Sequence, residues 1–386
     1  MEQIFTCGSG ECEQLGIPDV FQARIPKAVI LPEEVTTIAC GSMHTLALSN
    51  EGKVYSWGCN DDGALGRSGP ENLPGIVSGV HSVNKLSAGD SHSVAISDSL
   101  KLVYSWGTYR NSEGNMALAN KFPIEIKQFL KSKKISEVAS GGNHSLVLVD
   151  NKIYAWGDSE FGQIGRMPRS RRSVAASLTL ESVGAKNVTS IFTGRNHSFY
   201  KAYGKIYGWG LNNYGQLGDG GTKTTYSPHE IESLSQYEII DMQGGENHTL
   251  ALTDSGLLLS WGRNDDYQLG LNSTQDSLLP QVVRFSGNVR EISVGSHFNF
   301  LVTDKNRVYS WGYGDCYVLL NGKEKNLSMP TLVAWSVIKP VHSIKAGSQH
   351  VCILRNPGAL EIPNPHITQL KTRQKAQTSP KKKRNT

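Results

Sequence analysis

Two short sequence signatures recur about every 50 residues along this 386-residue chain, and this repetition limits its possible folds more than any other feature. The first is a glycine, two variable residues and His-Ser/Thr, followed by an apolar run. It occurs seven times, with Phe298 in place of the histidine in the sixth copy. The second is a short β-prone run that ends in Trp-Gly. The histidines are His44, His92, His144, His197, His248 and His350, and the tryptophans are Trp57, Trp106, Trp156, Trp209, Trp261 and Trp311.

These units predict an all-β fold. Each unit divides into four short alternating runs bounded by turns, which is typical of strands. Seven units of four strands indicate a seven-bladed β-propeller. The run "IFTCG" (4–8) has no histidine strand before it, and the last histidine strand has no Trp-Gly strand after it. We therefore expect the N-terminal strand to complete the last blade and close the ring, with the propeller spanning residues 1–356.

The repeated side chains are expected to be structural. A residue that recurs in every blade usually serves the blade, so we assign the tryptophans to packing between blades and the histidine ring to structure rather than catalysis. The glycines after the tryptophans allow tight strand ends or a positive φ. A metal site is disfavoured, because ring symmetry spreads the histidines too far apart to share one ion.

The positive charge lies at the C-terminal end. The net charge is +5, but seven bases and no acids follow Glu361, and without them 32 bases face 34 acids. Residues 357–386 are polar, basic and proline-containing, so we expect a disordered tail. Its basic run, predicted as a nuclear localisation signal or a DNA phosphate contact, is Lys381, Lys382, Lys383 and Arg384.

Other features exclude several classes of protein. No apolar run approaches the length needed to cross a bilayer, so no membrane partner is expected. The six cysteines are scattered without a CxxC pair, which indicates reduced thiols in an intracellular protein. The chain has no GxxxxGK phosphate loop and no evident nucleophile–base constellation, so we expect neither a bound nucleotide nor a hydrolase. No cofactor is indicated.

One unit departs from the pattern. In most of the chain Trp-Gly leads through a short polar loop to Leu-Gly or Ile-Gly, as in "SWGCNDDGALG" (56–66). In "SWGTYRNSEGNMAL" (105–118) that pair is replaced by a charged stretch. The second repeat therefore contains an insertion where the others have packing residues.

Residues 1–356 resemble the family of the regulator of chromosome condensation, in particular through "GSMHTLALSNEGKVYSWGCNDDGALGR" (41–67) and "SAGDSHS" (87–93). In this family the propeller is a guanine-nucleotide exchange factor for the small GTPase Ran, and one loop is replaced by a protruding β-wedge. The resemblance implies that 108–116 is this wedge, that GDP release comes from stabilising nucleotide-free Ran, and that no covalent catalysis is involved. It also implies a nuclear, chromatin-associated protein of nucleocytoplasmic transport, the cell cycle and mitosis, with Ran, histones or nucleosomes and DNA as partners.

The resemblance also suggests individual site residues. The residues implied in exchange itself are Asp90, Arg110 and His248. The further residues implied in GTPase binding are Glu11, His44, Tyr109, Asn111, Glu113, Asn143, Arg166 and His350. Three features depart from the family pattern. Asn143 stands where the family has a functional aspartate and Gly215 where it has a contact histidine, while segment 178–190 is shorter and less basic than the family's nucleosome-binding loop.

Two alternatives belong to other functional classes. A propeller used only as an interaction scaffold would keep both signatures, but would have no need for the insertion or for "GDSH" (89–92). A light receptor of the same type would need tryptophans clustered on one face, and none occupies those positions. The exchange hypothesis predicts that Asp90→Ala and deletion of 109–115 each slow nucleotide release from Ran while leaving the fold intact.

Overall fold

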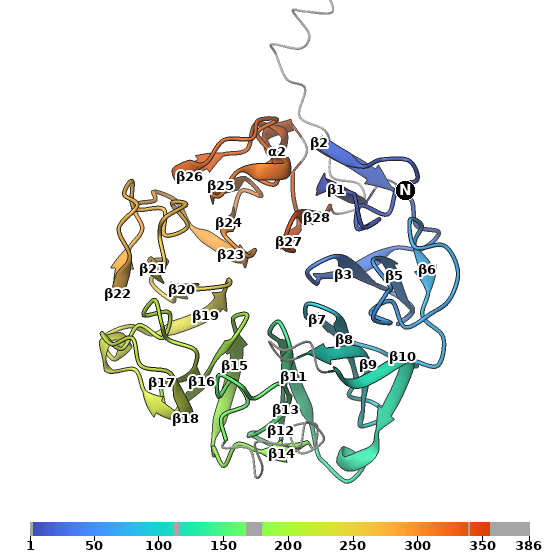
Figure 1. Ribbon diagram of the computed structural model, residues 1–386, viewed down its shortest axis with the longest axis horizontal. Coiled ribbons are helices and arrows are strands. Elements are labelled where there is room, and N and C mark those ends of the chain that lie inside the picture. The colour runs from blue at the N-terminus through green and yellow to red at the C-terminus, as the bar shows by residue number, and fades with distance from the viewer. Residues whose placement is uncertain (1–2, 111–115, 167–179, 339, 356–386) are drawn as a thin grey trace, which may run out of the picture.

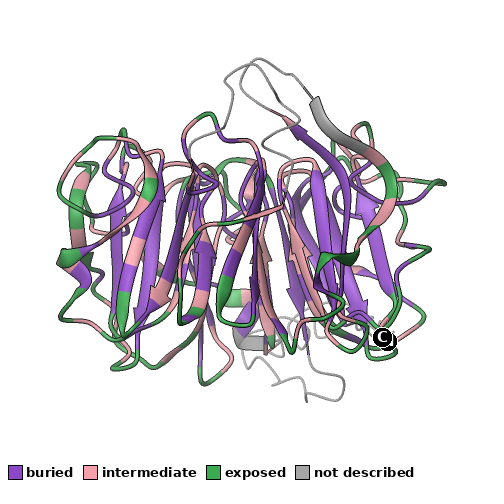
Figure 2. Ribbon diagram, turned by 90° about the horizontal axis from the view of Figure 1, so that it is seen from below, coloured by how far each residue is buried: buried purple, intermediate pink, exposed green. Residues whose placement is uncertain are grey.

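The predicted seven-bladed propeller is confirmed. The protein is described here by a computed structural model that covers residues 3–110, 116–166, 180–338 and 340–355. Within these ranges, 28 strands form seven four-stranded antiparallel sheets. Figure 1 shows the sheets arranged radially as blades around a central channel, and Figure 2 shows buried strands crossing the thickness of the disc. The expected tail (357–386) lies outside the described residues.

The blades follow the chain from its first histidine repeat. Blade 1 consists of β3 (Val35–Cys40), β4 (His44–Ser49), β5 (Val54–Gly58) and β6 (Gly75–Ile76). Blade 2 consists of β7 (Lys85–Ala88), β8 (His92–Ser97), β9 (Leu102–Arg110) and β10 (Met116–Ile126). Blade 3 consists of β11 (Ile135–Ser140), β12 (His144–Val149), β13 (Lys152–Gly157) and β14 (Glu181–Ser182). Blade 4 consists of β15 (Val188–Thr193), β16 (His197–Ala202), β17 (Lys205–Gly210) and β18 (Thr225–Glu230).

The remaining blades complete the ring. Blade 5 consists of β19 (Ile239–Gly244), β20 (His248–Thr253), β21 (Leu258–Gly262) and β22 (Ser277–Val282). Blade 6 consists of β23 (Val289–Val294), β24 (Phe298–Thr303), β25 (Val308–Gly312) and β26 (Leu327–Leu332). Blade 7 consists of β27 (Ser343–Ala346), β28 (His350–Leu354), β1 (Ile4–Ser9) and β2 (Gln22–Val29). The described helices are η1 (Lys127–Phe129), η2 (Glu232–Leu234), η3 (Asp315–Tyr317) and α2 (Ala334–Ile338), none of which is long and apolar enough to span a bilayer.

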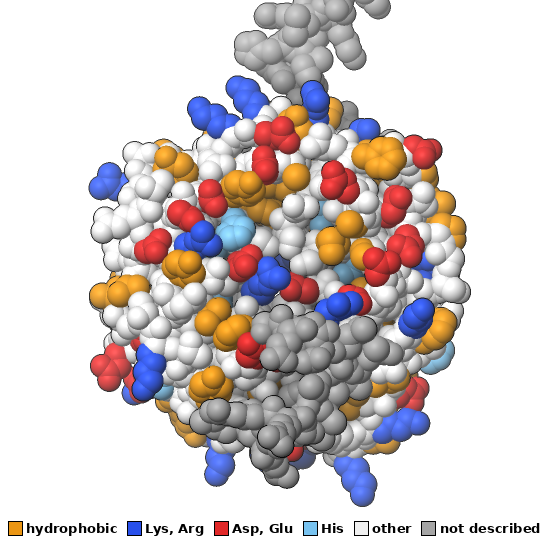
Figure 3. Space-filling model, in the orientation of Figure 1, with side chains coloured by type: hydrophobic (Ala, Val, Ile, Leu, Met, Phe, Trp, Pro, Cys, Tyr) orange, Lys and Arg blue, Asp and Glu red, His pale blue; other side chains and the backbone are white. Residues whose placement is uncertain are grey.

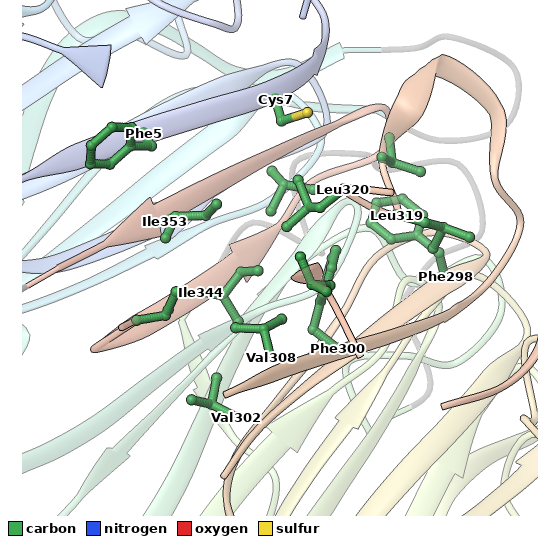
Figure 4. Packing of buried hydrophobic residues seen from close by; sticks show 14 residues of the cluster. Phe5, Cys7, Phe298, Phe300, Val302, Val308, Leu319, Leu320, Ile344 and Ile353 are labelled. Carbon is green, nitrogen blue, oxygen red and sulfur yellow. The ribbon is translucent and has the colours of Figure 1, made fainter. Parts of the chain in front are cut away.

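The two ends of the propeller meet in blade 7, as the unpaired repeat halves predicted. Strand β1 pairs with β28, with Phe5 opposite Ile353, and β2 adds a second N-terminal strand outside it. Figure 4 shows Phe5 and Cys7 of β1 in the same apolar cluster as Ile353 and the blade 6 residue Phe300. Ring closure therefore depends on strand pairing and on a shared core between residues from both ends of the propeller.

The repeated tryptophans and histidines connect neighbouring blades. The six tryptophans are at most 1% exposed. Trp261, for example, donates its indole N–H to the carbonyl of Gln216 in the preceding blade, at 2.8 Å. His197 Nε2 lies 2.9 Å from the Thr249 hydroxyl, which itself donates to Gln216. Because the hydroxyl has only one proton, His197 must donate through Nε2, which the neutral imidazole can do.

The glycines of the Trp-Gly pairs have the positive φ that the sequence predicted. Gly262, at +103°, ends β21 beside the start of β20, and a Cβ there would lie 2.4 Å from the carbonyl oxygen of Asn247. The backbone therefore turns tightly out of each strand, and the next residue bonds back to the loop, as Arg263 N–H does to Asn247. Outside blade 2, whose strand continues past Gly107, this turn leads into a loop on the same face of the disc.

The buried histidines predict that the fold is sensitive to acid. Burial lowers the pKa of His44, His144 and His197 from 6.5 to about 3, and that of His248 to about 4. Below pH 6.5 the unfolded chain therefore binds more protons than the folded one, and stability should fall by up to about 1.4 kcal/mol per pH unit for each histidine.

We expect the urea midpoint to drop steeply between about pH 6 and 4 as these histidines become charged in the unfolded chain. Circular dichroism at a series of pH values measures this dependence. His197→Gln should make it shallower, whereas the exposed His81→Ala should leave it unchanged. A constant midpoint from pH 7 to 4 would contradict the assignment of the histidines as buried neutral donors.

Candidate functional site

The loops that precede the histidine strands surround the mouth of the channel. In each loop, the residue after the first glycine borders this opening. The seven residues, in blade order, are Ser42, Asp90, Gly142, Arg195, Glu246, Ser296 and Ser348. Unlike the tryptophans and histidines, these residues are of several types: three are serine, one is glycine and three are charged. The mouth is therefore the place where the repeat symmetry is broken.

A chain of polar contacts runs around the mouth, and Arg195 is at its centre. One guanidinium nitrogen of Arg195 lies 3.2 Å from Asp90 and another 3.0 Å from Glu246. Asp90 also accepts a bond of 2.7 Å from the Ser42 hydroxyl, which lies 2.8 Å from that of Ser348. Gly142 makes this bridge possible, because a Cβ there would lie 2.8 Å from Arg195 Cγ and 2.9 Å from the Asp90 carboxylate.

The mouth carries opposite charges close together. A hydrogen bond from His297, at 3.2 Å, and the charge of Arg195 lower the pKa of Glu246 to about 2. Burial by itself would lower the pKa of Arg195. The negative charges of Asp90 and Glu246 outweigh this effect, so the pKa of Arg195 is raised. Figure 3 looks onto this face, with acidic and basic side chains around its centre. The arrangement holds the Asp90 carboxylate in a fixed orientation while its side chain remains 21% exposed.

A long β-hairpin rises from the same face in blade 2. The corresponding strands of the other six blades have five or six residues, whereas β9 has nine and its partner β10 has eleven. Gly107 of β9 pairs with His92, the residue that follows the Asp90 loop, and Thr108–Arg110 continue beyond it. Arg110 pairs with Met116 across the hairpin. The strands that lead into the predicted wedge therefore project from the face that carries Asp90.

Tyr109 replaces the missing Leu-Gly segment at the interface between blades 2 and 3. In several other blades the tryptophan N–H bonds to the carbonyl that precedes this pair, as Trp106 does to Ala64 at 2.8 Å. Trp156 instead donates to the Tyr109 hydroxyl at 2.7 Å. The Tyr109 ring is 1% exposed and stacks on His92 with centroids 4.0 Å apart. The second repeat can thus lose its Leu-Gly pair without leaving the tryptophan unpaired.

The base of the hairpin is fixed to both neighbouring blades. The Arg110 guanidinium forms a two-point ion pair with Asp62 of blade 1, with Nε 3.1 Å from one carboxylate oxygen. On the other side, the Asn143 side-chain carbonyl accepts the Arg110 backbone N–H at 2.9 Å. A carboxylate could accept the same bond, so the departure to Asn143 preserves this support. The hairpin therefore leaves the disc at a fixed position.

Four of the predicted contact residues lie inside the propeller. Tyr109, His44, His248 and His350 are at most 1% exposed. The histidines each bond to the next blade, as His248 Nε2 does to Asn299 at 2.8 Å. We therefore correct the prediction of a surface contact for these four side chains and assign them to packing between blades, because the face of another protein cannot reach them.

The other predicted residues are distributed over the loop face or lie beyond the described ranges. Glu11 is exposed in the loop that follows β1. Arg166 is largely buried, with its guanidinium 3.8 Å from Glu181 and 3.3 Å from the Ala155 carbonyl. Gly215 has φ of +75°, and a Cβ there would lie 2.5 Å from Leu278, so a histidine would be strained. The remaining predictions, on Asn111, Glu113, Lys381, Lys382, Lys383 and Arg384, lie outside the described residues.

Arg195 is the residue that the sequence analysis missed. It occupies the same loop position as Asp90, but in blade 4. Comparing the copies at that position would have shown an acid, a base and a second acid at Asp90, Arg195 and Glu246 within one ring. That the three side chains meet could not be read from the sequence, since it depends on how far Arg195 reaches past Gly142.

Comparison with known proteins identifies the family. A family model described as the RCC1-like domain matches residues 3–353. The chain belongs to this family. The human regulator of chromosome condensation is 32% identical over 382 residues, which cover 91% of this chain and 90% of the human protein. The resemblance seen in the sequence is therefore confirmed.

A curated yeast sequence and a solved yeast structure add to this. The Saccharomyces cerevisiae guanine nucleotide exchange factor SRM1 is 31% identical over 323 residues, covering 69% of this chain and 66% of that protein. The crystal structure of Prp20p from the same yeast, described together with its binding to Gsp1p and histones, superimposes with a TM-score of 0.86 at 27% identity. It covers 97% of this chain and 95% of Prp20p.

Proposed function

We propose that this protein is a guanine-nucleotide exchange factor for Ran that acts through its loop face, as a regulator of a GTPase without covalent chemistry. The observation that carries the proposal is the β9–β10 hairpin, which leaves the disc beside Asp90. Family membership supports the reaction class, since relatives over most of the chain include a named exchange factor and a propeller with a described binding to Gsp1p. A pure scaffold would give no reason for the extended hairpin.

The geometry supports a mechanism based on rigid positioning. Exchange requires the nucleotide-free partner to be bound more tightly than the loaded one, and nucleotide must weaken the exchange factor by the same factor. Moving a partner from 1:99 to 99:1 needs about 5.5 kcal/mol of differential affinity. The mouth contributes an oriented carboxylate at Asp90, and the hairpin contributes strands fixed by Arg110. Because the base of the hairpin is fixed, a force at its far end should act on the partner and should not bend the hairpin.

Stimulated release of fluorescent GDP from purified Ran tests this function. The protein at a small fraction of the Ran concentration should accelerate release over many turnovers in the presence of excess unlabelled nucleotide. Binding to Ran without any acceleration would support the scaffold alternative. Acceleration only at equimolar protein would contradict a cycling exchange factor.

Arg195 should position Asp90 for this reaction. Arg195→Ala removes the ionic partner from two carboxylates, and loss of a charged hydrogen bond of this kind costs about 1.5–3 kcal/mol. We expect kcat/KM for GDP release to fall by about tenfold or more. Arg195→Lys should be intermediate, because an ammonium ion cannot present the planar fork that joins Asp90 and Glu246. Equal rates for all three proteins would remove Arg195 from the site.

We also propose that the protein acts in the nucleus at chromatin. The relative Prp20p is described as binding histones. In this chain, the basic run 381–384 and the arginines at 169, 171 and 172 supply positive charge that could contact DNA phosphate or acidic histone surfaces. Binding of reconstituted nucleosomes should weaken when the chain is shortened to residue 356, and the difference between the two forms should shrink as the salt concentration rises. Equal binding by the two forms would contradict a role for the tail.

A further inference from the structure

Two cysteines face each other where the first and last blades meet. Cys40 ends β3 of blade 1, and Cys352 lies in β28 of blade 7. The Cys40 sulfur lies 3.4 Å from the carbonyl oxygen of Lys345, and Lys345 is the cross-strand partner of Cys352. Cys352 belongs to a buried apolar cluster, and Cys40 packs against that cluster from the channel side. Both are free thiols in this structure.

The two thiols differ in access. Cys40 is half-buried and borders the channel, which inside the ring has a volume of about 650 Å³. Cys352 has no exposed surface. Cys40 can therefore be reached by a small solute through the channel, whereas Cys352 has no direct contact with solvent. An accessible thiol beside a buried second thiol is the arrangement found in redox-sensing proteins.

The surroundings also favour Cys40 as the reactive thiol. Burial alone would raise the pKa of the Cys40 thiol, but the neighbouring Cys352 thiol and the His350 ring outweigh this and lower it. For the other cysteines, all of which lie within the described residues, burial is the leading cause and raises the pKa: these are Cys7, Cys12, Cys59, Cys316 and Cys352. The thiolate is the nucleophilic form, so Cys40 should react first at neutral pH.

We propose that Cys40 and Cys352 form a peroxide-sensitive dithiol that closes into a disulfide across the seam of the ring. The Cys40 thiolate attacks hydrogen peroxide, the O–O bond breaks, and Cys40 becomes a sulfenic acid as hydroxide leaves. The Cys352 sulfur then attacks the Cys40 sulfur, and the S–O bond breaks. The released hydroxide takes the Cys352 proton, so two thiols and one peroxide give one disulfide and two waters.

The disulfide would make the closure of the ring covalent. In the reduced protein, blades 1 and 7 are held together by packing and hydrogen bonds, and the pairing of β1 with β28 closes the ring. A bond between Cys40 and Cys352 would enclose nearly the whole propeller in one loop, and cross-links that close long loops restrict the unfolded chain most. We therefore expect the oxidised protein to resist unfolding more than the reduced one. This inference does not depend on the exchange activity.

Labelling of the unmodified protein gives the first test. At pH 6.5, limiting iodoacetamide followed by peptide mass spectrometry should modify Cys40 before the half-buried Cys12 and Cys59. Treatment with hydrogen peroxide should then yield a peptide pair linked through Cys40 and Cys352, two hydrogens lighter than the separate peptides. The urea midpoint should rise on oxidation and return on reduction.

Variants separate the two steps. In Cys352→Ser, peroxide should leave a sulfenic acid at Cys40 that dimedone captures, whereas Cys40→Ser should give neither product. Cys59→Ser is the matched control and should behave as the unmodified protein. First labelling at Cys12 or Cys59, a disulfide with another pairing, or no change in the urea midpoint on oxidation would each overturn the proposal.

Discussion

Replacing residues 111–115 with Asn-Gly should lower the maximal rate of GDP release from Ran by about 100-fold, equivalent to about 3 kcal/mol of lost transition-state stabilisation. Asn-Gly suits a two-residue hairpin turn, so Arg110 and Met116 can remain paired and the strands can close at their described ends. The variant removes the tip and keeps the fixed base. Affinity for the loaded GTPase should change less than the release rate, because the mouth residues are untouched.

This replacement is narrower than the deletion of 109–115 that the sequence suggests. Tyr109 carries the interface between blades 2 and 3, since it accepts the Trp156 N–H and stacks on His92. Its loss would combine an effect on stability with one on exchange. Thermal unfolding of the Asn-Gly variant should match that of the unmodified protein. Normal release rates in a correctly folded variant would exclude the hairpin tip from the mechanism.

Replacing Asp90 with alanine should reduce kcat/KM for GDP release by about 30-fold or more, the effect of losing about 2 kcal/mol at an interface hot spot. The carboxylate is held by Ser42 and Arg195 yet remains partly exposed, so it can bind a partner without first being ordered. Without the Asp90 carboxylate, Arg195 keeps only Glu246 as an ionic partner in the mouth. A partner surface would then meet a basic group in place of an acidic one.

Two matched variants define the cause of this effect. Asp90→Asn keeps the shape of the side chain and can still accept hydrogen bonds, so any remaining deficit reports the charge. Asp304→Ala removes one exposed carboxylate from the turn between β24 and β25, on the opposite face of the disc. The Asp304→Ala variant should stimulate GDP release from Ran at the normal rate. An equal loss in Asp304→Ala would point to a general effect of charge rather than to the mouth.

The sequence predicts the fold well because each conserved position of the repeat has a structural role that follows from its residue type. Each Trp-Gly pair indicates a buried indole followed by a residue with positive φ. The two incomplete repeats, at 4–8 and 347–354, predict that the ring closes between them. The second N-terminal strand of blade 7, Gln22–Val29, does not follow from these two incomplete repeats. Strands at the two ends of a propeller can be divided between blades in more than one way, and their pairing decides between them.

The site was harder to predict, because it depends on where each side chain points. The histidines His44, His248 and His350 begin their strands next to exposed loops, and sequence position alone cannot distinguish the rim from the space between blades. Tyr109 illustrates the same limit, since its role follows from its distance to Trp156. Asp90 was found by resemblance, whereas its partner Arg195 required the described geometry of the mouth.

Hydrogen exchange of the complex with nucleotide-free Ran tests the central claim most directly. Relative to the free propeller, protection should appear in loops 41–43, 89–91 and 245–247 and in β9–β10, and addition of GDP should reverse it. Protection confined to the opposite turns, such as 50–52 and 254–256, or protection that survives GDP, would contradict exchange through the loop face.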